Sequence, residues 1–86
     1  MYIIIVYDVN VDRVNKVNKF LKAYLHWQQN SVFEGKVTKS QYNEIIDKLN
    51  KLTDEDEDPV IIYKFPYKYL EKRVLGIEKN PISFIL

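Results

Sequence analysis

Two runs of apolar residues stand out along the chain, at residues 2–7 and 60–65. Both are rich in β-branched and aromatic side chains and alternate little with polar residues. Such continuous runs are typical of strands that are buried on both faces. Pro59 and Pro66 bracket the second run, and because proline cannot donate a ladder hydrogen bond, they limit its length. The pattern therefore predicts two buried strands.

Two stretches between these strands carry apolar residues at helical spacing. At ~100° per residue, the apolar positions that follow Val11 fall within an arc of about 140°. Asn10 or Asp12 can cap the start of this helix with a side-chain oxygen. Thr38, with Gln41 three residues later, predicts a capping box before the second helix. The apolar positions are Val14, Val17, Phe20, Leu21, Tyr24 and Leu25 in the first stretch and Tyr42, Ile45, Ile46, Leu49 and Leu52 in the second.

Residues 26–37 separate the two helical stretches and predict a short hairpin, in which Gly35 permits a bulge or a close approach. The pattern does not determine the register of this hairpin. The resulting order, βαββαβ, is the ferredoxin-like split motif of the α+β class. In that topology the strand at 60–65 lies at a sheet edge, and both helices cover one face of the sheet.

The face of the sheet without helices must also be buried, because both long strands are apolar on both sides. A lone subunit cannot bury that face, so we expect a two-fold homodimer in which these faces stack. The 86 residues form a single domain, with residues 67–86 as a dimer-capping tail. Strand-like pieces at 73–76 and 82–86 predict an additional C-terminal strand that pairs with an exposed edge.

Composition narrows the class of protein. A domain of this size buries only ~60 to 65 % of the surface that its unfolded chain exposes, which makes oligomerisation plausible. With no cysteine and one histidine, His26, the chain has no disulfide framework, thiol nucleophile or multi-histidine metal site. No apolar run approaches the ~18 residues of a membrane span, and no basic region precedes the first run. We expect a soluble, unprocessed, cytoplasmic protein without a membrane partner.

Charge is unevenly distributed although the net charge is only +1. Five of the twelve acidic residues are consecutive, at 54–58, and this run is interpreted as a solvated loop. Lys16, Lys19 and Lys22 fall on the polar arc of the first helix, while Arg13 lies nearer its apolar edge. These cations form either an ordinary solvated face or a phosphate-contacting surface.

Asp8 is the strongest candidate for chemistry, because it ends the first buried strand and precedes a helix. A strand-end carboxylate offers oxygen to a hard cation such as Mg²⁺, although one carboxylate binds weakly. In a symmetric dimer an aspartate near the two-fold axis occurs twice, so a pair could share one ion and support metal-assisted phosphodiester hydrolysis. The alternative is that Asp8 caps the first helix or accepts a local hydrogen bond.

Two other chemistries are disfavoured by spacing. The alternating oxygens from Asp8 to Asp12 resemble the start of a calcium loop, but Arg13 replaces the required glycine and Lys19 the bidentate glutamate. Nothing in the spacing of His26, Ser31 and Glu34 fixes the geometry of a nucleophilic triad. Most aromatic residues occupy apolar-periodic positions and are expected in the core rather than on a base-stacking surface.

Four segments together resemble the CRISPR-associated protein 2 family: Tyr2 to Val9 with its strand-end Asp8, Asn30 to Gly35 before a capped helix, Val60 to Tyr63, and Leu75-Gly76. The resemblance covers essentially the whole chain. It implies a ferredoxin-like homodimer that joins the CRISPR-associated protein 1 integrase in acquiring spacer DNA. Some members are described as metal-dependent ribonucleases or deoxyribonucleases, and Asp8 matches the family's metal-binding aspartate. The family would not lead us to expect the acidic run at 54–58.

The resemblance leaves two roles open, an enzyme and an assembly module, and we favour the assembly module as the physiological role. As an enzyme, a metal-dependent endonuclease, the protein would use Asp8 as its catalytic and metal-binding residue, with Mg²⁺, on RNA or DNA. As an assembly module, it would bridge integrase subunits and contact duplex DNA through Arg13, Lys16, Lys19 and Lys36 without sequence readout. Alternatives are a stand-alone toxin-like ribonuclease, a non-catalytic nucleic-acid scaffold and a small-ligand regulatory domain.

Overall fold

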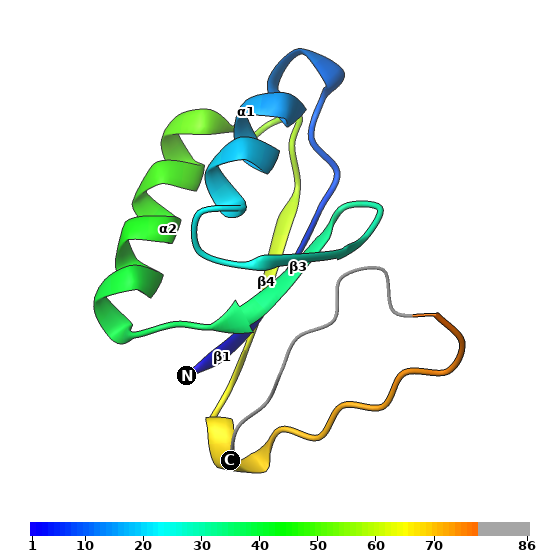
Figure 1. Ribbon diagram of the computed structural model, residues 1–86. Helices are drawn as coiled ribbons and strands as arrows, with labels where there is room; N and C mark the ends of the chain where they lie inside the picture. The colour runs from blue at the N-terminus through cyan, green and yellow to red at the C-terminus, as the bar shows by residue number, and fades with distance from the viewer. Residues whose placement is uncertain (78–86) are drawn as a thin grey trace.

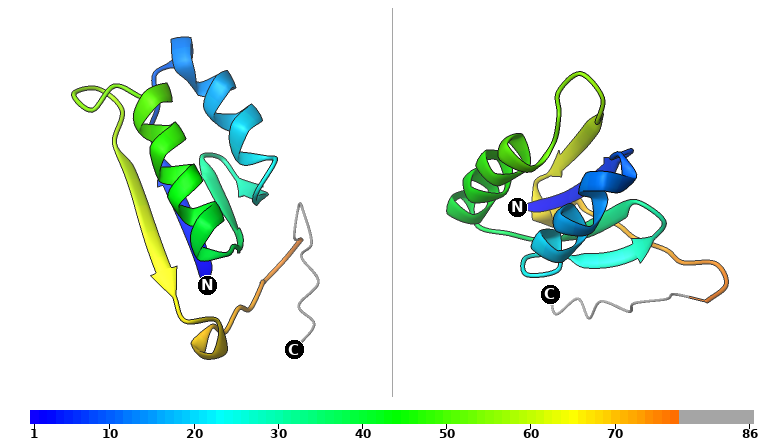
Figure 2. Two further views of the ribbon diagram at one scale, coloured as in Figure 1. Left: turned by 90° about the vertical axis from the view of Figure 1, so that its left-hand side faces the viewer. Right: turned by 90° about the horizontal axis from the view of Figure 1, so that it is seen from above.

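A single four-stranded antiparallel sheet with two helices on one face forms the domain (Figures 1 and 2). The computed structural model describes residues 1–77, apart from the side chain of Tyr67. The strand order β2-β3-β1-β4 places β4 at an edge and confirms the predicted βαββαβ arrangement. The elements are β1 (Tyr2–Tyr7), α1 (Val11–Leu21), β2 (His26–Gln29), β3 (Val32–Lys36), α2 (Lys39–Leu52), β4 (Val60–Phe65) and the 3-10 turn η1 (Tyr67–Tyr69).

Strand β1 lies between β3 and β4 and carries the centre of the core. Its side chains alternate, so that Ile3 and Ile5 face the helices and are fully buried against Val17 of α1 and Ile45 of α2. Burying an aliphatic side chain of this size stabilises a fold by roughly 1.5 to 3 kcal/mol. The sheet and helices are therefore held together mainly by the middle strand, which also positions the loop that follows Tyr7.

Both helices begin where the sequence predicts. The side chain of Asn10 accepts a hydrogen bond from the Asp12 backbone N–H at 2.9 Å and caps α1. At the start of α2, Thr38 and Gln41 form the reciprocal capping box, with distances of 2.9 and 3.1 Å. Each cap satisfies backbone donors that have no partner within the helix.

The end of α1 differs from the prediction, which extended the helical pattern through Leu25. The helix ends at Leu21, and after Lys22 the backbone amides of Ala23 and Tyr24 bond three residues back, to the carbonyls of Phe20 and Leu21. This tighter turn redirects the chain into β2 while Leu25 still reaches the core. The apolar positions were correctly assigned to the core, but the last two lie outside the helix.

The predicted hairpin is present, and its irregularity lies in β2 rather than at glycine. The register shifts between Trp27 and Gln29, and Asn30 turns the chain with a φ of 44°. Gly35 instead provides a close approach, because a Cβ at this position would lie 3.1 Å from the Leu25 Cδ2 atom. The glycine therefore allows the segment after α1 to pack directly over β3.

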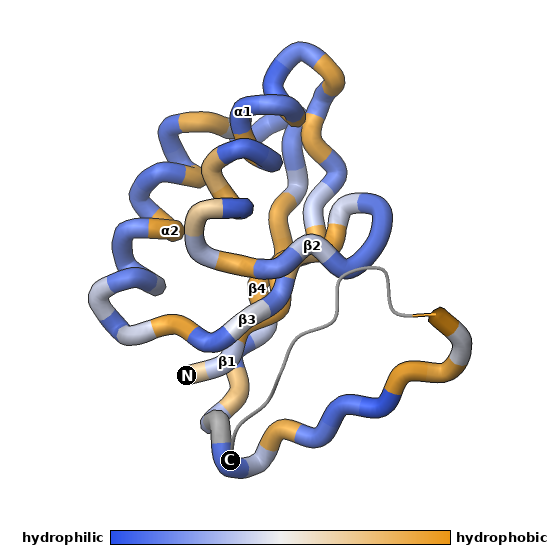
Figure 3. The backbone as a smooth tube through the Cα atoms, in the orientation of Figure 1, coloured by the Kyte–Doolittle hydropathy of each residue, from blue (hydrophilic) through white to orange (hydrophobic). Residues whose placement is uncertain are grey.

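The face of the sheet without helices is only partly covered by the described chain. Ile61 and Tyr63 of β4 lie on it, opposite Val6 and Ile4, and are 51 % and 50 % exposed. The first three residues of β4, Val60 to Ile62, are hydrophobic (Figure 3). Within residues 1–77, the observation supports the expectation that part of this face is left unburied.

A small polar network occupies the other half of the same face. The buried Glu34 carboxylate accepts a hydrogen bond from the Tyr2 hydroxyl and one from the Lys72 ammonium, both at 2.8 Å. Lys72 also donates to Gln28 at 2.9 Å, so the chain that follows η1 is anchored to β2 and β3. Residues 73–76 form no strand in the described chain, whereas the predicted piece at 82–86 lies outside the described residues.

Candidate functional site

Asp8 lies at the carboxyl end of β1, in the loop that leads to α1. Its backbone N–H donates to the Pro59 carbonyl at 3.0 Å, and the preceding Tyr7 N–H donates to the Ser31 carbonyl at 3.1 Å. The side chain is exposed, and the hydrogen bonds and ion pairs of residues 1–77 leave its carboxylate unengaged. Because Asn10 caps α1, the alternative that Asp8 serves as the helix cap is wrong.

The acidic run contains a buried carboxylate that the sequence did not reveal. Asp58 is only 4 % exposed and accepts hydrogen bonds from the backbone N–H groups of Asn10 and Asp54, at 2.9 and 2.8 Å. Arg13 of α1 binds the same carboxylate with two nitrogens, Nε at 2.5 Å and Nη2 at 3.0 Å. The prediction of a solvated loop is therefore correct for Glu55, Asp56 and Glu57 but wrong for Asp58.

The Arg13–Asp58 pair is a bidentate, charge-assisted interaction across 45 residues of sequence. Arg13, first by its hydrogen bonds, and the two backbone donors hold the pKa of the Asp58 carboxyl well below its usual range, although desolvation opposes this shift. Arg13 also contacts Glu57 at 2.8 Å, and both carboxylates raise the pKa of its guanidinium. Arg13 was expected to contact duplex DNA with its positive charge. In the structure, Asp58 and Glu57 pair with this charge.

The remaining predicted phosphate contacts lie on two different surfaces. Lys16 and Lys19 are exposed on α1, on the side opposite its buried residues. Lys36 pairs in register with Tyr2, which places it on the face of the sheet without helices. The structure therefore brings Lys16 and Lys19 onto one surface and separates Lys36 from them.

The described residues of one chain contain few side chains that could bind a metal ion together. Residues 1–77 contain no group of three or more histidine, cysteine, aspartate or glutamate side chains that could hold one. Mg²⁺ is commonly held by one or two carboxylates while it keeps several waters, and an exposed carboxylate oxygen is the hard donor that it prefers. Asp8 fits this chemistry as a single weak ligand. A second copy of the chain would supply a second Asp8 carboxylate.

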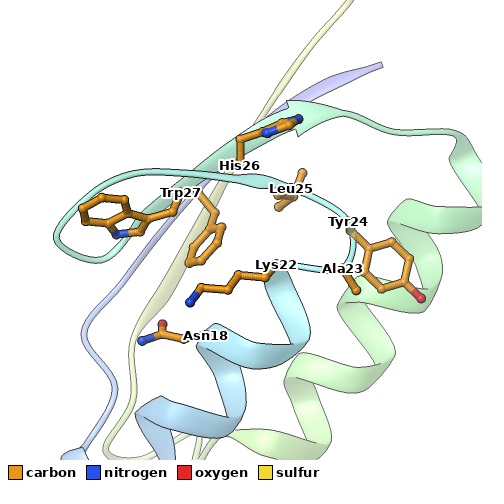
Figure 4. A pocket seen from close by; sticks show the side chains of 8 residues that line it. Asn18, Lys22, Ala23, Tyr24, Leu25, His26 and Trp27 are labelled. Carbon is orange, nitrogen blue, oxygen red and sulfur yellow. The ribbon is translucent and has the colours of Figure 1, made fainter. Parts of the chain in front are cut away.

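A hollow beside the end of α1 is separate from Asp8 (Figure 4). Asn18 of α1 and Lys22, which directly follows the helix, form one side, and Trp27 of β2 forms another. The Tyr7 hydroxyl donates to the Asn18 side-chain oxygen behind it, and burial raises the pKa of Tyr7 to about 12. The hydrogen bond from this hydroxyl connects the end of β1 to α1.

The Cas2 family model, described as "CRISPR associated protein Cas2", matches residues 1–73. The chain belongs to the Cas2 family. It is 59 % identical, over 100 % of its length and 76 % of the relative's, to a protein from Methanocaldococcus jannaschii named CRISPR-associated endoribonuclease Cas2. A protein of the same name from Pyrococcus furiosus is 55 % identical, with 100 % of both chains covered.

Solved Cas2 structures share the fold of this chain. A crystal structure titled as Cas2 superposes with a TM-score of 0.81 and 51 % identity, covering 100 % of this chain and 98 % of that one. The Cas2 structure from Streptococcus pyogenes, solved at pH 6.5, gives a TM-score of 0.72 at 30 % identity, with 88 % and 100 % covered. The resemblance inferred from the strand-end Asp8 and the hairpin is thereby confirmed at the level of family and fold.

Proposed function

We propose that this Cas2 protein acts as a homodimeric, Mg²⁺-dependent endoribonuclease in which Asp8 of each chain supplies the metal ligand. The observation that carries the proposal is the exposed, unengaged carboxylate at the end of the central strand. The Asp8 N–H binds the Pro59 carbonyl and the preceding Tyr7 N–H binds the Ser31 carbonyl, so the side chain projects from a backbone that is tied to two neighbouring segments. The names of the relatives, at up to 59 % identity, favour ribonuclease activity over other uses of such a group.

Dimerisation follows from the partly uncovered sheet face. Ile61 and Tyr63 are half exposed on the edge strand of the described sheet, where exposed apolar side chains favour contact with a second copy. Stacking two such faces about a two-fold axis would bury these residues and bring two Asp8 side chains toward that axis. The proposed metal site therefore depends on the dimer, which supplies two Asp8 carboxylates where one chain supplies one.

The chemistry that Mg²⁺ supplies when bound is stabilisation of charge on the scissile phosphate and activation of water. The chain's own contribution is to place the Asp8 carboxylate at a solvent-accessible edge, where a phosphodiester of an RNA strand can reach it. Of its neighbours, Asn10 caps α1 through its side-chain oxygen, which accepts the Asp12 N–H, and Asp12 lies in the first turn of the helix rather than at the end of the strand. Asp8 therefore remains the residue assigned to cleavage.

A second role, in spacer acquisition, is favoured by the cationic surface of α1. Lys16 and Lys19 are exposed on the outer side of this helix and suit phosphate contacts without sequence readout. We propose that the dimer also bridges subunits of the CRISPR-associated protein 1 integrase on duplex DNA. This role depends on shape and charge and does not require the Asp8 carboxylate.

Substitution of Asp8 by asparagine separates the two roles, because it keeps the shape and removes the charge. We expect Asp8→Asn to abolish Mg²⁺-dependent cleavage of a single-stranded RNA, while dimerisation and spacer acquisition in cells that carry the integrase are retained. Asp56→Asn is the matched control, since Asp56 is also an exposed aspartate in a loop and should leave cleavage unchanged. Cleavage that survives Asp8→Asn would overturn the catalytic assignment, and acquisition that falls in step with cleavage would make hydrolysis the essential function.

A further inference from the structure

The loop that carries Asp8 is held from one side by two neighbouring acceptors, the buried Asp58 carboxylate and the Pro59 carbonyl. Asp58 accepts the Asn10 N–H at 2.9 Å, and the carbonyl of its neighbour Pro59 accepts the Asp8 N–H at 3.0 Å. The loop between β1 and α1 is therefore bonded on both sides of Val9 to one short segment before β4. Within residues 1–77, no hydrogen bond or ion pair in this arrangement involves the Asp8 side chain.

Arg13 fixes the orientation of the Asp58 carboxylate. Its guanidinium binds both carboxylate oxygens, Oδ2 through Nε at 2.5 Å and Oδ1 through Nη2 at 3.0 Å. The Asp54 N–H completes the set at 2.8 Å, and the Asp58 side chain has no exposed surface. With four donors and no solvent contact, this carboxylate has one well-defined position.

We propose that Asp58 is a positioning residue for the Asp8 metal ligand, acting through Asn10 and Pro59 and oriented by Arg13. This proposal rests on the function proposed above, in which Asp8 binds Mg²⁺. It assigns Arg13 to the support of the metal site rather than to nucleic acid. It also gives the acidic run a role, because only its last residue lies where it can hold the β1–α1 loop.

The test compares Mg²⁺ titrations of RNA cleavage by the full-length wild-type protein, Asp58→Asn and the control Glu57→Gln. Groups that orient a metal ligand typically change metal affinity about 10- to 100-fold when substituted, so we expect the half-saturating Mg²⁺ concentration of Asp58→Asn to rise by that factor. The rate at saturating Mg²⁺ should recover to near the wild-type value. Glu57→Gln removes the exposed partner of Arg13 and keeps Asp58, so its titration should match the wild type.

A purely structural role gives a different result. Asp58→Asn would then lower the folded fraction and the maximal rate while the half-saturating Mg²⁺ concentration stays unchanged, and this outcome would overturn the proposal. If Asp58→Asn does not fold, Arg13→Lys takes its place, because lysine keeps the charge but cannot bind both oxygens in a planar fork. The same rise in half-saturating Mg²⁺, smaller in size, is expected for that variant.

Hydrogen exchange of the Asp8 and Asn10 amides, measured by NMR without metal, provides a readout that is independent of cleavage. We expect exchange of both amides to accelerate at least about tenfold in folded Asp58→Asn, because their acceptor segment is released. Unchanged exchange would overturn the positioning role even if the wild type cleaves RNA. Accelerated exchange in a wild type that proves inactive would support the positioning role while the proposed function fails.

Discussion

Asp58 and the four acidic residues before it carry the same charge in the sequence but have different environments in the fold. Glu55, Asp56 and Glu57 are exposed, whereas Asp58 is buried by Arg13 and by the start of α1. A buried carboxylate is tolerated because donors surround it, and breaking such a pair leaves an uncompensated charge. The local composition of the run is dominated by its exposed members, which explains why sequence reasoning placed all five in solvent.

The low pKa of Asp58 predicts a specific dependence of stability on pH. Because the folded state holds this pKa below that of the unfolded chain, about 3.9, the contribution of Asp58 is fully present above about pH 4. It is lost as the pH falls further toward the folded-state pKa. The melting temperature of the wild type should therefore fall below pH 4, and that of Asp58→Asn should start lower and fall less.

Thermal denaturation followed by circular dichroism between pH 2 and pH 7 would measure this difference. Asp56→Asn serves as the control, because an exposed carboxylate should leave the wild-type pH dependence unchanged. If Asp58→Asn and the wild type gave parallel curves of melting temperature against pH, the Arg13–Asp58 pair would not contribute to folding as the structure indicates.

At the scale of elements, patterns that depend on neighbouring residues were predicted well. The capping box at Thr38, the β4 strand and the position of Asp8 at a strand end all follow from local spacing and are present in the structure. The end of α1 was missed because Leu25 continues the apolar periodicity while packing from a turn. The Arg13–Asp58 pair joins α1 to the loop before β4, and because only the folded sheet brings these segments together, local spacing does not identify the partner of Arg13. Arg13 near the apolar edge of its helix was the available signal.

The capping box at the start of α2 makes a quantitative prediction. Thr38→Ala removes the side-chain acceptor of the Gln41 N–H, and loss of such a cap costs about 1 kcal/mol, within a range of 0.5 to 2. Urea denaturation should show this decrease in the free energy of unfolding with an unchanged slope. Ser40→Ala, in the first turn of the same helix, is the control and should change stability by less than about 0.5 kcal/mol. Equal effects of the two substitutions would argue against the cap.

At the scale of the whole molecule, the account depends on a second copy of the chain. The helices cover one face of the sheet, and Lys72 covers part of the other by binding Glu34. Ile61 and Tyr63 remain half exposed at the β4 edge, and in the described part of the chain no hydrogen bond or ion pair engages the Asp8 carboxylate. Family membership is established by the comparisons, but the shared metal site and the bridging of integrase subunits both require the dimer.

The most direct test is the mass of the full-length protein by sedimentation velocity, compared with Ile61→Lys and the control Asn50→Lys. Ile61→Lys places a charge on the face of the sheet without helices, whereas Asn50→Lys adds the same charge to the exposed side of α2. The account predicts twice the 10.3 kDa mass of one chain for the wild type and Asn50→Lys, and a shift toward monomer for Ile61→Lys. A wild-type protein that sediments as a well-folded monomer at the concentrations used for cleavage would contradict it.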